Sequence, residues 1–319
     1  GFRVLQSTGA HPVWALLGEC TVWRHRILPV RVLALNQSAV SELDQAWIER
    51  NGFFGGTADR FGNDLAELLD HVLGEPAWDE LRLSGLMREQ ANVALALVAS
   101  RGLTGRIELD EPIHWVDLQR VRGQHSGDYP AALSANTRQQ LRRARRLAER
   151  ELGALRLDEA ASVDEALDWF DRTAPLHRAR WGAGTGPASG SGFDNPEFTA
   201  FHRRLIRIAF AQGGVQYLRL SVGSTITAYL YNLVSAGHVH FYLSGVDYGL
   251  AESLKPGMLA HWLAIERNLA AGNRLYDFLA GDAQYKRSLA TDSDRMSWVV
   301  LQRRRWSLRA EALARRAKG

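Results

Sequence analysis

Hydrophobic and polar residues alternate in three consecutive segments of the second half of the chain, 215–223, 224–237 and 238–247. A period of two is typical of half-buried strands. Short turns of glycine or serine separate the segments, so we expect three antiparallel strands. A loop, a long apolar helix, a strand and a short helix follow, up to Leu289. The region 238–289 is therefore the unit around which the sequence is best interpreted.

The loop between the third strand and the long helix carries Lys255, Pro256 and Gly257. A loop that leads from a strand into a helix N-terminus favours anions, because its free backbone N–H groups and the positive end of the helix dipole face the same point. The pattern therefore predicts an anion site at this loop.

Shorter elements of alternating type fill the rest of the chain. In the first half, the patterns predict a strand hairpin or meander at 13–35, a short helix at 41–50 and a turn into a short strand at 51–54. A helix at 59–73, a strand at 78–83, a helix at 88–100 and a strand at 107–118 follow. After a loop at 119–133, they predict a helix at 136–150 that Asn136 caps, a strand at 154–160 and helices at 162–180 and 195–211. The chain is expected to end with a strand at 298–302 and a basic amphipathic helix at 303–319. This order indicates a mixed α/β protein.

Composition narrows the class of protein. Hydrophobic residues make up 46% and charged residues 23% of the chain, which is typical of a soluble globular protein. The single cysteine, Cys20, excludes an internal disulfide and fits a reducing compartment, so we expect a cytoplasmic protein. No apolar run approaches the roughly 20 residues that a membrane span needs, so we expect no integral membrane segment. The chain begins at Gly1 rather than Met, which leaves open that an N-terminal piece is missing or cleaved.

The formal net charge of +4 comes from two local runs of basic residues, 138–150 and 303–318. The favoured interpretation of the first run is a solvated face on a connecting helix, since that helix also has an apolar stripe to bury. The alternative is a contact for a phosphate-rich substrate or a nucleic acid. For the C-terminal run, a solvated helix is favoured over a helix that contacts a membrane surface or a partner. The glycine-rich segment 182–192 is expected to be a loop, either a lid beside a substrate or a surface insertion.

The order of the central elements resembles the GNAT acyltransferase fold. The segment 245–286, GVDYGLAESLKPGMLAHWLAIERNLAAGNRLYDFLAGDAQYK, resembles the acetyltransferase domain of CelD-type proteins, which are associated with bacterial cellulose and exopolysaccharide biosynthesis. It is more remotely similar to the Fem-type aminoacyl transferases, which contain two GNAT-like domains. LSANTRQQLRRARR at 133–146 and VDEALDWFDRTAPLHRARW at 163–181 resemble the basic inter-domain helix of this group and the segment after it.

The resemblance implies an α/β, tandem GNAT-like fold, in which each of two domains has a mostly antiparallel central sheet flanked by helices. It implies a degenerate GNAT-like domain at 1–133, a basic connecting helix at 134–152, the acyltransferase domain at 153–302 and a basic C-terminal helix at 303–319. The degenerate domain is expected to have a substrate-side role.

The resemblance also implies acetyl-CoA as the donor substrate. The residues that would bind it are Ser244, Gly245, Lys255, Pro256, Gly257 and Met258. Breaks in the strands at Ser244–Gly245 and after Phe278 are expected to open backbone N–H groups beside the donor's carbonyl. The loop departs from the usual GNAT pyrophosphate motif, because only the glycine at 257 is in place. The Fem-type relatives use aminoacyl-tRNA, so this departure leaves the donor open.

Direct acyl transfer needs a base for the acceptor and a donor for the developing oxyanion. Lys286, at the position of the aromatic–Lys pair of Fem-type enzymes, is the candidate for oxyanion stabilisation, with a surface lysine as the alternative. Asp277 is either a general base or a structural ion pair, because a carboxylate on an apolar strand needs a partner. Tyr285 is a candidate acid, although such tyrosines more often belong to the core.

The acceptor is expected to contact Asp247, His177, Trp181 and Arg142. His238 and His240 share a strand face, but two histidines without an acidic cluster predict no metal site.

Three hypotheses follow. The first is an acyl-CoA-dependent acetyltransferase that acts on a small-molecule or saccharide acceptor in exopolysaccharide biosynthesis. The second is a Fem-type aminoacyl or peptidyl transferase whose partner is tRNA. The third is a catalytically inert GNAT-like module of a polysaccharide synthase complex, which the glycine-poor loop supports.

Overall fold

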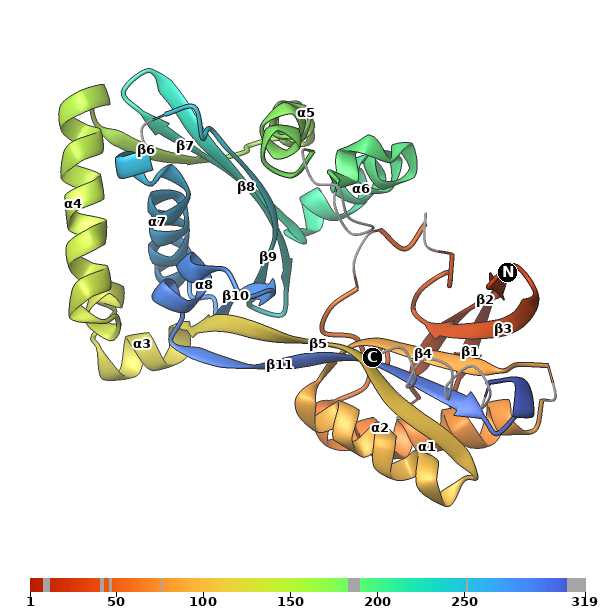
Figure 1. Cartoon of the computed structure of the whole chain (residues 1–319). Coiled ribbons are helices and arrows are strands. Elements are labelled where there is room, and N and C mark those ends of the chain that lie inside the picture. The colour runs from red at the N-terminus through yellow and green to blue at the C-terminus, as the bar shows by residue number, and fades with distance from the viewer. Residues whose placement is uncertain are drawn as a thin grey trace. The chain divides into compact units, whose positions relative to one another are not determined.

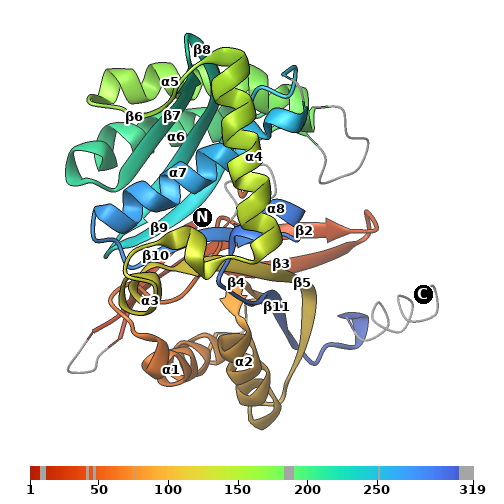
Figure 2. The same cartoon turned by 90° about the vertical axis from the view of Figure 1, so that its left-hand side faces the viewer.

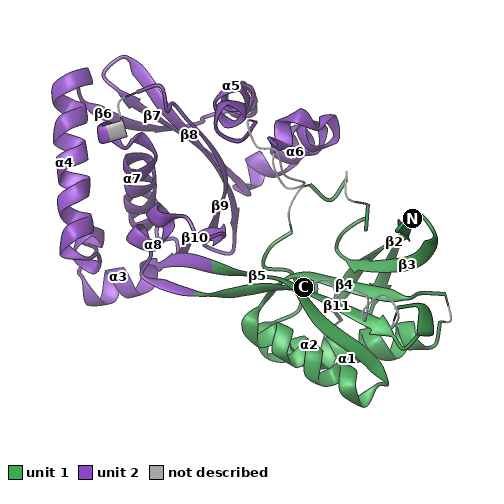
Figure 3. Ribbon diagram, viewed as in Figure 1, with its two compact units in different colours: residues 1–112, 294–319 green, residues 113–293 purple. Residues whose placement is uncertain are grey.

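The computed structural model describes residues 1–7, 12–40, 43–45, 48–75, 77–182, 190–250 and 252–308 (Figure 1). The chain forms two compact units (Figure 3). Unit 1 contains residues 1–112 and 294–319, and unit 2 contains residues 113–293. None of the helices in these described stretches is long and apolar enough to cross a membrane.

Unit 2 is built on a mostly antiparallel sheet. The strands β6 (Leu155–Glu159), β7 (Val215–Val222), β8 (Thr225–Ser235) and β9 (His238–Val246) follow one another as antiparallel neighbours. This confirms the three alternating strands predicted between 215 and 247. Next to β9 lies β10 (Leu275–Ala280), which pairs with it in parallel, and beyond β10 lies the C-terminal part of β5 (Leu103–Asp117).

Helices cover both faces of this sheet (Figures 1 and 2). One face packs against α5 (Val163–Trp181) and α6 (Pro196–Ala209), and the other packs against α7 (Pro256–Ala270), which α4 (Ala135–Leu152) lies alongside. The remaining helices of the unit are α3 (Leu118–Gln124) and α8 (Gln284–Leu289). The two faces have separate apolar cores, so the sheet separates the α5–α6 side from the α4–α7 side.

Unit 1 repeats much of this order. Its antiparallel strands β1 (Phe2–Gln6), β2 (Trp14–Arg24) and β3 (Leu28–Leu35) precede α1 (Phe61–Leu73), β4 (Glu80–Met87) and α2 (Arg88–Ser100). As with β9 and β10, the strands on either side of the helix, β3 and β4, pair in parallel. The predicted fold class is confirmed: the chain is a mixed α/β protein with mostly antiparallel sheets flanked by helices.

The chain passes between the units along two strands. β5 starts in unit 1, but its residues Ile113–Asp117 pair with β10 in unit 2. Conversely, β11 (Asp292–Arg303) follows α8, but its residues Met296–Gln302 pair with β4 in unit 1. The two compact units therefore meet within β5 and near the start of β11.

The local predictions differ from the structure at a few places. The segment 119–133, predicted as a loop, contains most of α3 and a 3₁₀ turn at Tyr129–Ala132, because Asp117 caps α3 and Leu118 and Val121 are buried. The cap of α4 is Ser134 and not Asn136: its Oγ accepts a hydrogen bond from the Thr137 N–H. The predicted helix at 41–50 lies partly outside the described residues and is a turn at 43–45.

Two further predictions lie mostly outside the described residues. Most of the glycine-rich segment at 182–192 falls outside, because 183–189 are not described. Of the C-terminal basic helix, only 303–308 is described, with a helical turn at 306–308.

Candidate active site

The strands β9 and β10 separate after a short stretch of pairing. Their parallel hydrogen bonding covers three residue pairs and ends at His240 and Asp277. Beyond this point β9 continues to Val246 as a partner of β8, and the end of β10 pairs with β5 through Ala280. Neighbouring strands that diverge leave backbone groups between them without a ladder partner, so these groups bond to side chains or face a ligand.

The end of β10 has an irregular backbone. Its pairing with β5 shifts register between Asp277 and Ala280, and Leu279 has a positive φ of 59°, which is uncommon for a residue with a side chain. The buried Asp277 accepts a hydrogen bond from the Leu279 N–H at 2.9 Å. Its other carboxylate oxygen lies 3.6 Å from His240 Nδ1. Asp277 therefore supports both the irregular turn of β10 and the last paired residue of β9.

Lys286 supports the same turn from α8. Its side chain is buried, and its Nζ donates hydrogen bonds to the carbonyl oxygens of Leu279 at 3.3 Å and Ala280 at 2.5 Å. Buried carbonyl groups need such partners. The ammonium is thus engaged with the backbone at the point where β9 and β10 diverge. We name the segment 277–281, with its two supports Asp277 and Lys286, the β10 turn.

Aromatic rings pack around His261 on the adjacent helix α7. Tyr285 stacks on His261, with ring centroids 5.1 Å apart and an interplanar angle of 13°. His261 also lies 3.0 Å from the hydroxyl of Tyr276, through its Nδ1. Burial lowers the pKa of His261 to about 3, with a smaller effect from the Lys286 charge. Burial raises the pKa of Tyr285, so this phenol keeps its proton at neutral pH.

The predicted anion loop, which carries Lys255, Pro256 and Gly257 and which we name the α7 loop, leads into α7. Lys255 is the N-cap in a left-handed conformation, and Pro256 is the first helical residue. Pro256 has no N–H, so this helix start offers fewer amide donors than one with another residue at this position. A Cβ on Gly257 would make only ordinary contact with Val246, at 3.6 Å. Packing within the chain therefore does not account for a glycine at position 257.

The strand break expected at Ser244–Gly245 is absent, because β9 pairs with β8 through both residues. The irregularity in this pair lies at Tyr242 instead. A Cβ on Gly245 would approach the Thr173 carbonyl oxygen to 3.0 Å, so this glycine permits close packing of α5 against β9. Its residue type is therefore explained by helix packing and not by an open N–H group.

The residues predicted to contact the acceptor lie on opposite faces of the sheet. His177 and Trp181 belong to α5, where His177 Nδ1 lies 2.8 Å from Ser191 Oγ, and burial lowers the pKa of His177 to about 4. Half-buried Asp247 accepts a hydrogen bond from the Gly249 N–H. Arg142 is exposed on α4, on the other face.

Lys255 of the α7 loop is linked to α4 by a hydrogen bond of its Nζ to Gln140 Oε1 at 2.9 Å. The neighbouring Met258 is half-buried within the apolar core on the α4–α7 side.

Sequence reasoning missed His114. It lies on β5, far from the motifs in sequence, and only the pairing of β5 with β10 brings it to the β10 turn. An isolated histidine in a strand pattern carries no local signal of such a contact.

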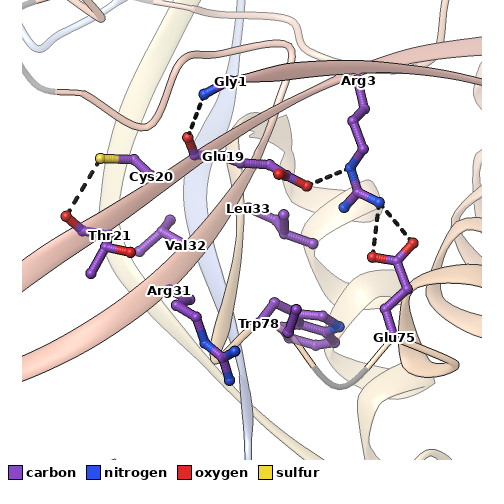
Figure 4. A pocket seen from close by; sticks show the side chains of 11 residues that line it. Gly1, Arg3, Glu19, Cys20, Thr21, Arg31, Val32, Leu33, Glu75 and Trp78 are labelled. Atoms are coloured by element: carbon purple, nitrogen blue, oxygen red, sulfur yellow. Dashed lines mark hydrogen bonds and ion pairs between the residues drawn. The ribbon is translucent and has the colours of Figure 1, made fainter.

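A separate pocket of about 240 Å³ lies in unit 1 (Figure 4). Arg3 at its rim bonds with Glu19 and Glu75, and Trp78 contributes to its wall. None of the predicted site residues lines it. Among the described residues, no group of three or more His, Cys, Asp or Glu side chains is placed to hold a metal ion.

Comparison with known proteins agrees with this geometry. Residues 135–287, which include β9, the α7 loop and the β10 turn, match the family described as acetyltransferase (GNAT) domain. This region, which lies within unit 2, is therefore similar to a GNAT acetyltransferase domain. No curated protein matches the sequence.

Three solved structures share the fold of nearly the whole chain. FemX is similar with a TM-score of 0.59 and 9% sequence identity over 93% of this chain and 88% of that chain. The C-terminal domain (DUF2156) of a proposed lysylphosphatidylglycerol synthetase from Agrobacterium fabrum is similar with a TM-score of 0.57 and 11% sequence identity, over 98% of this chain and 86% of that chain. L-PGS from Bacillus licheniformis is similar with a TM-score of 0.54 and 12% sequence identity, over 99% of this chain and 88% of that chain. At these identities the similarity is one of fold.

Proposed function

We propose that the protein transfers an acyl group from an acyl-CoA thioester to an amine or hydroxyl group of a small-molecule or saccharide acceptor. The separation of β9 and β10 beyond His240 and Asp277, inside the region that matches the GNAT domain, carries this proposal. The acyl carbonyl would lie in that opening, with the rest of the donor directed to the α7 loop. The exopolysaccharide setting rests on the sequence resemblance alone.

The side chains around this opening have different roles in the proposed acyl transfer. Lys286 and Asp277 act as positioning residues, because both already bond to the backbone of the β10 turn. Burial keeps Tyr285 protonated at neutral pH, so its phenol is suited to donate a hydrogen bond to the leaving thiolate. These assignments favour the structural interpretation of Asp277 over its role as a general base.

Titration calorimetry with acetyl-CoA and CoA tests the donor. The wild-type chain should bind both, and Gly257→Glu should weaken binding at least tenfold, because the new carboxylate faces the donor's phosphates. An acidic residue in the first turn of α7 is otherwise favourable for the helix. Gly123→Glu is the matched control, since a Cβ at Gly123 meets no atom within 4 Å. Absence of binding at millimolar acetyl-CoA would contradict this donor.

A second candidate donor is aminoacyl-tRNA, as the Fem-type resemblance implies. The observation that favours it is the basic face of α4: Arg142, Arg143 and Arg146 are exposed and form no ion pair among the described residues. The affinity of the protein for tRNA should then fall steeply as the salt concentration rises, because contacts with phosphates depend on ionic strength. Arg142→Glu with Arg146→Glu should abolish such binding, whereas Arg150→Glu should have a smaller effect because Arg150 already pairs with Glu151.

A further inference from the structure

A buried histidine lies beside the β10 turn and has no role in the assignments above. His114 on β5 is 6% exposed. Its neighbours Ile113 and Trp115 pair with Ala280 and Asp277, so His114 stands opposite the part of β10 where the register shifts. Ala280 is also the residue whose carbonyl binds Lys286. The imidazole is therefore fixed next to the backbone that Lys286 and Asp277 support.

The Nε2 atom of His114 lies near a carboxylate. His114 Nε2 is buried without a hydrogen-bond partner among the described residues, and Asp282 Oδ1 lies 3.6 Å away. Asp282 also pairs with Arg287, which helps to keep its carboxylate ionised. A buried polar atom with no partner is uncommon in native proteins and calls for an explanation.

The surroundings keep the imidazole neutral. Burial lowers the pKa of His114, and the positive charges of Lys286 and Arg287 act in the same direction. The carboxylate of Asp282 opposes this effect and would stabilise an imidazolium once it forms. A neutral histidine beside a carboxylate is the arrangement that a general base requires.

We propose that His114, oriented by Asp282, is the general base of the acyl transfer. This inference rests on the proposed function. The imidazole takes the proton from the attacking amine or hydroxyl group of the acceptor, directly or through one water molecule. The new bond forms between that nitrogen or oxygen and the acyl carbon, the carbon–sulfur bond of the thioester breaks, and the proton returns to the thiolate to give CoA. Asp282 is a positioning residue, because it acts through the imidazole.

The test follows the release of CoA thiol from acetyl-CoA with water as acceptor, between pH 5 and 9. His114→Gln keeps a polar side chain but cannot take a proton. It should bind acetyl-CoA like the wild type in calorimetry, release thiol about 100-fold more slowly and lose the rise of rate with pH on the acidic side. Asp282→Asn should give a smaller loss. His71→Gln, an exposed histidine in unit 1, should leave rate and profile unchanged.

A wild-type rate and pH profile in His114→Gln would overturn the proposal. If the wild-type chain neither binds acetyl-CoA nor releases thiol, the proposed donor is wrong. Titration of the His114 imidazole by NMR then tests separately whether Asp282 acts on His114. The pKa of His114 should fall further in Asp282→Asn, because the carboxylate that favours the imidazolium is lost. An unchanged pKa would show that the two groups are not coupled and would overturn the proposal on its own.

Discussion

Replacement of Lys286 by methionine tests whether this residue supports the β10 turn. Methionine keeps an unbranched stem of similar length, so the packing of α8 is largely preserved. The substitution removes two hydrogen bonds from a charged donor, to the carbonyls of Leu279 and Ala280. Hydrogen bonds that involve a charged group contribute about 1.5–3 kcal/mol each, whereas the desolvation of the buried ammonium is also removed. We therefore expect a net loss of about 2–4 kcal/mol in the free energy of unfolding.

Thermal unfolding followed by circular dichroism measures this loss. One kcal/mol lowers Tm by about 2–4 °C in a domain of roughly 150–250 residues, so Lys286→Met should lower it by about 4–16 °C. Arg287→Met is the control, since the neighbouring Arg287 is about half exposed and its surface ion pair contributes at most about 1 kcal/mol. An unchanged or higher Tm in Lys286→Met would refute the reasoning. The ammonium would then be a buried charge that the fold tolerates for catalysis.

Two further predictions concern the fold around the site. Gly245→Ala should lower the free energy of unfolding by about 1–3 kcal/mol in urea titrations, because its Cβ would crowd the Thr173 backbone; Gly123→Ala, which meets no atom, should not show this loss. Burial lowers the pKa of His202 to about 4 and that of His261 to about 3, so the unfolded chain binds protons below about pH 6.5 that the folded chain does not. The urea midpoint should therefore fall between pH 7 and pH 5, and the fall should be smaller in His202→Gln; an equal fall in both proteins would contradict a neutral, buried His202.

The sequence predicted those parts of the fold that depend on neighbouring residues. Alternation and glycine turns are local signals, so the three strands from Val215 to Val246 could be predicted. The start of the helix predicted at 162–180 also depended on local residues, and in the structure Ser162 caps α5. At α4 the pattern predicted Asn136 as the cap, whereas Ser134 caps the helix in the structure. The difference depends on which side chain reaches a free N–H group.

The candidate site depended on contacts between distant segments, which periodicity does not reveal. The passage of β5 into unit 2 brings His114 to Asp282, and no pattern within either segment predicts this pairing. Gly245 was interpreted as an opening in a strand, but its residue type follows from the packing of α5 on β9. Lys286 could be identified as a candidate from its motif, whereas its burial and its carbonyl partners required the structure.

The central claim is that the opening between β9 and β10 holds an activated acyl group. A crystal structure with a hydrolysis-resistant acetyl-CoA analogue, in which a methylene group replaces the thioester sulfur, tests it most directly. We predict the acyl carbonyl between the strands, beyond His240 and Asp277, with the pyrophosphate at the α7 loop beside Gly257. Binding of the analogue at another place, or none at millimolar concentration, would contradict the account.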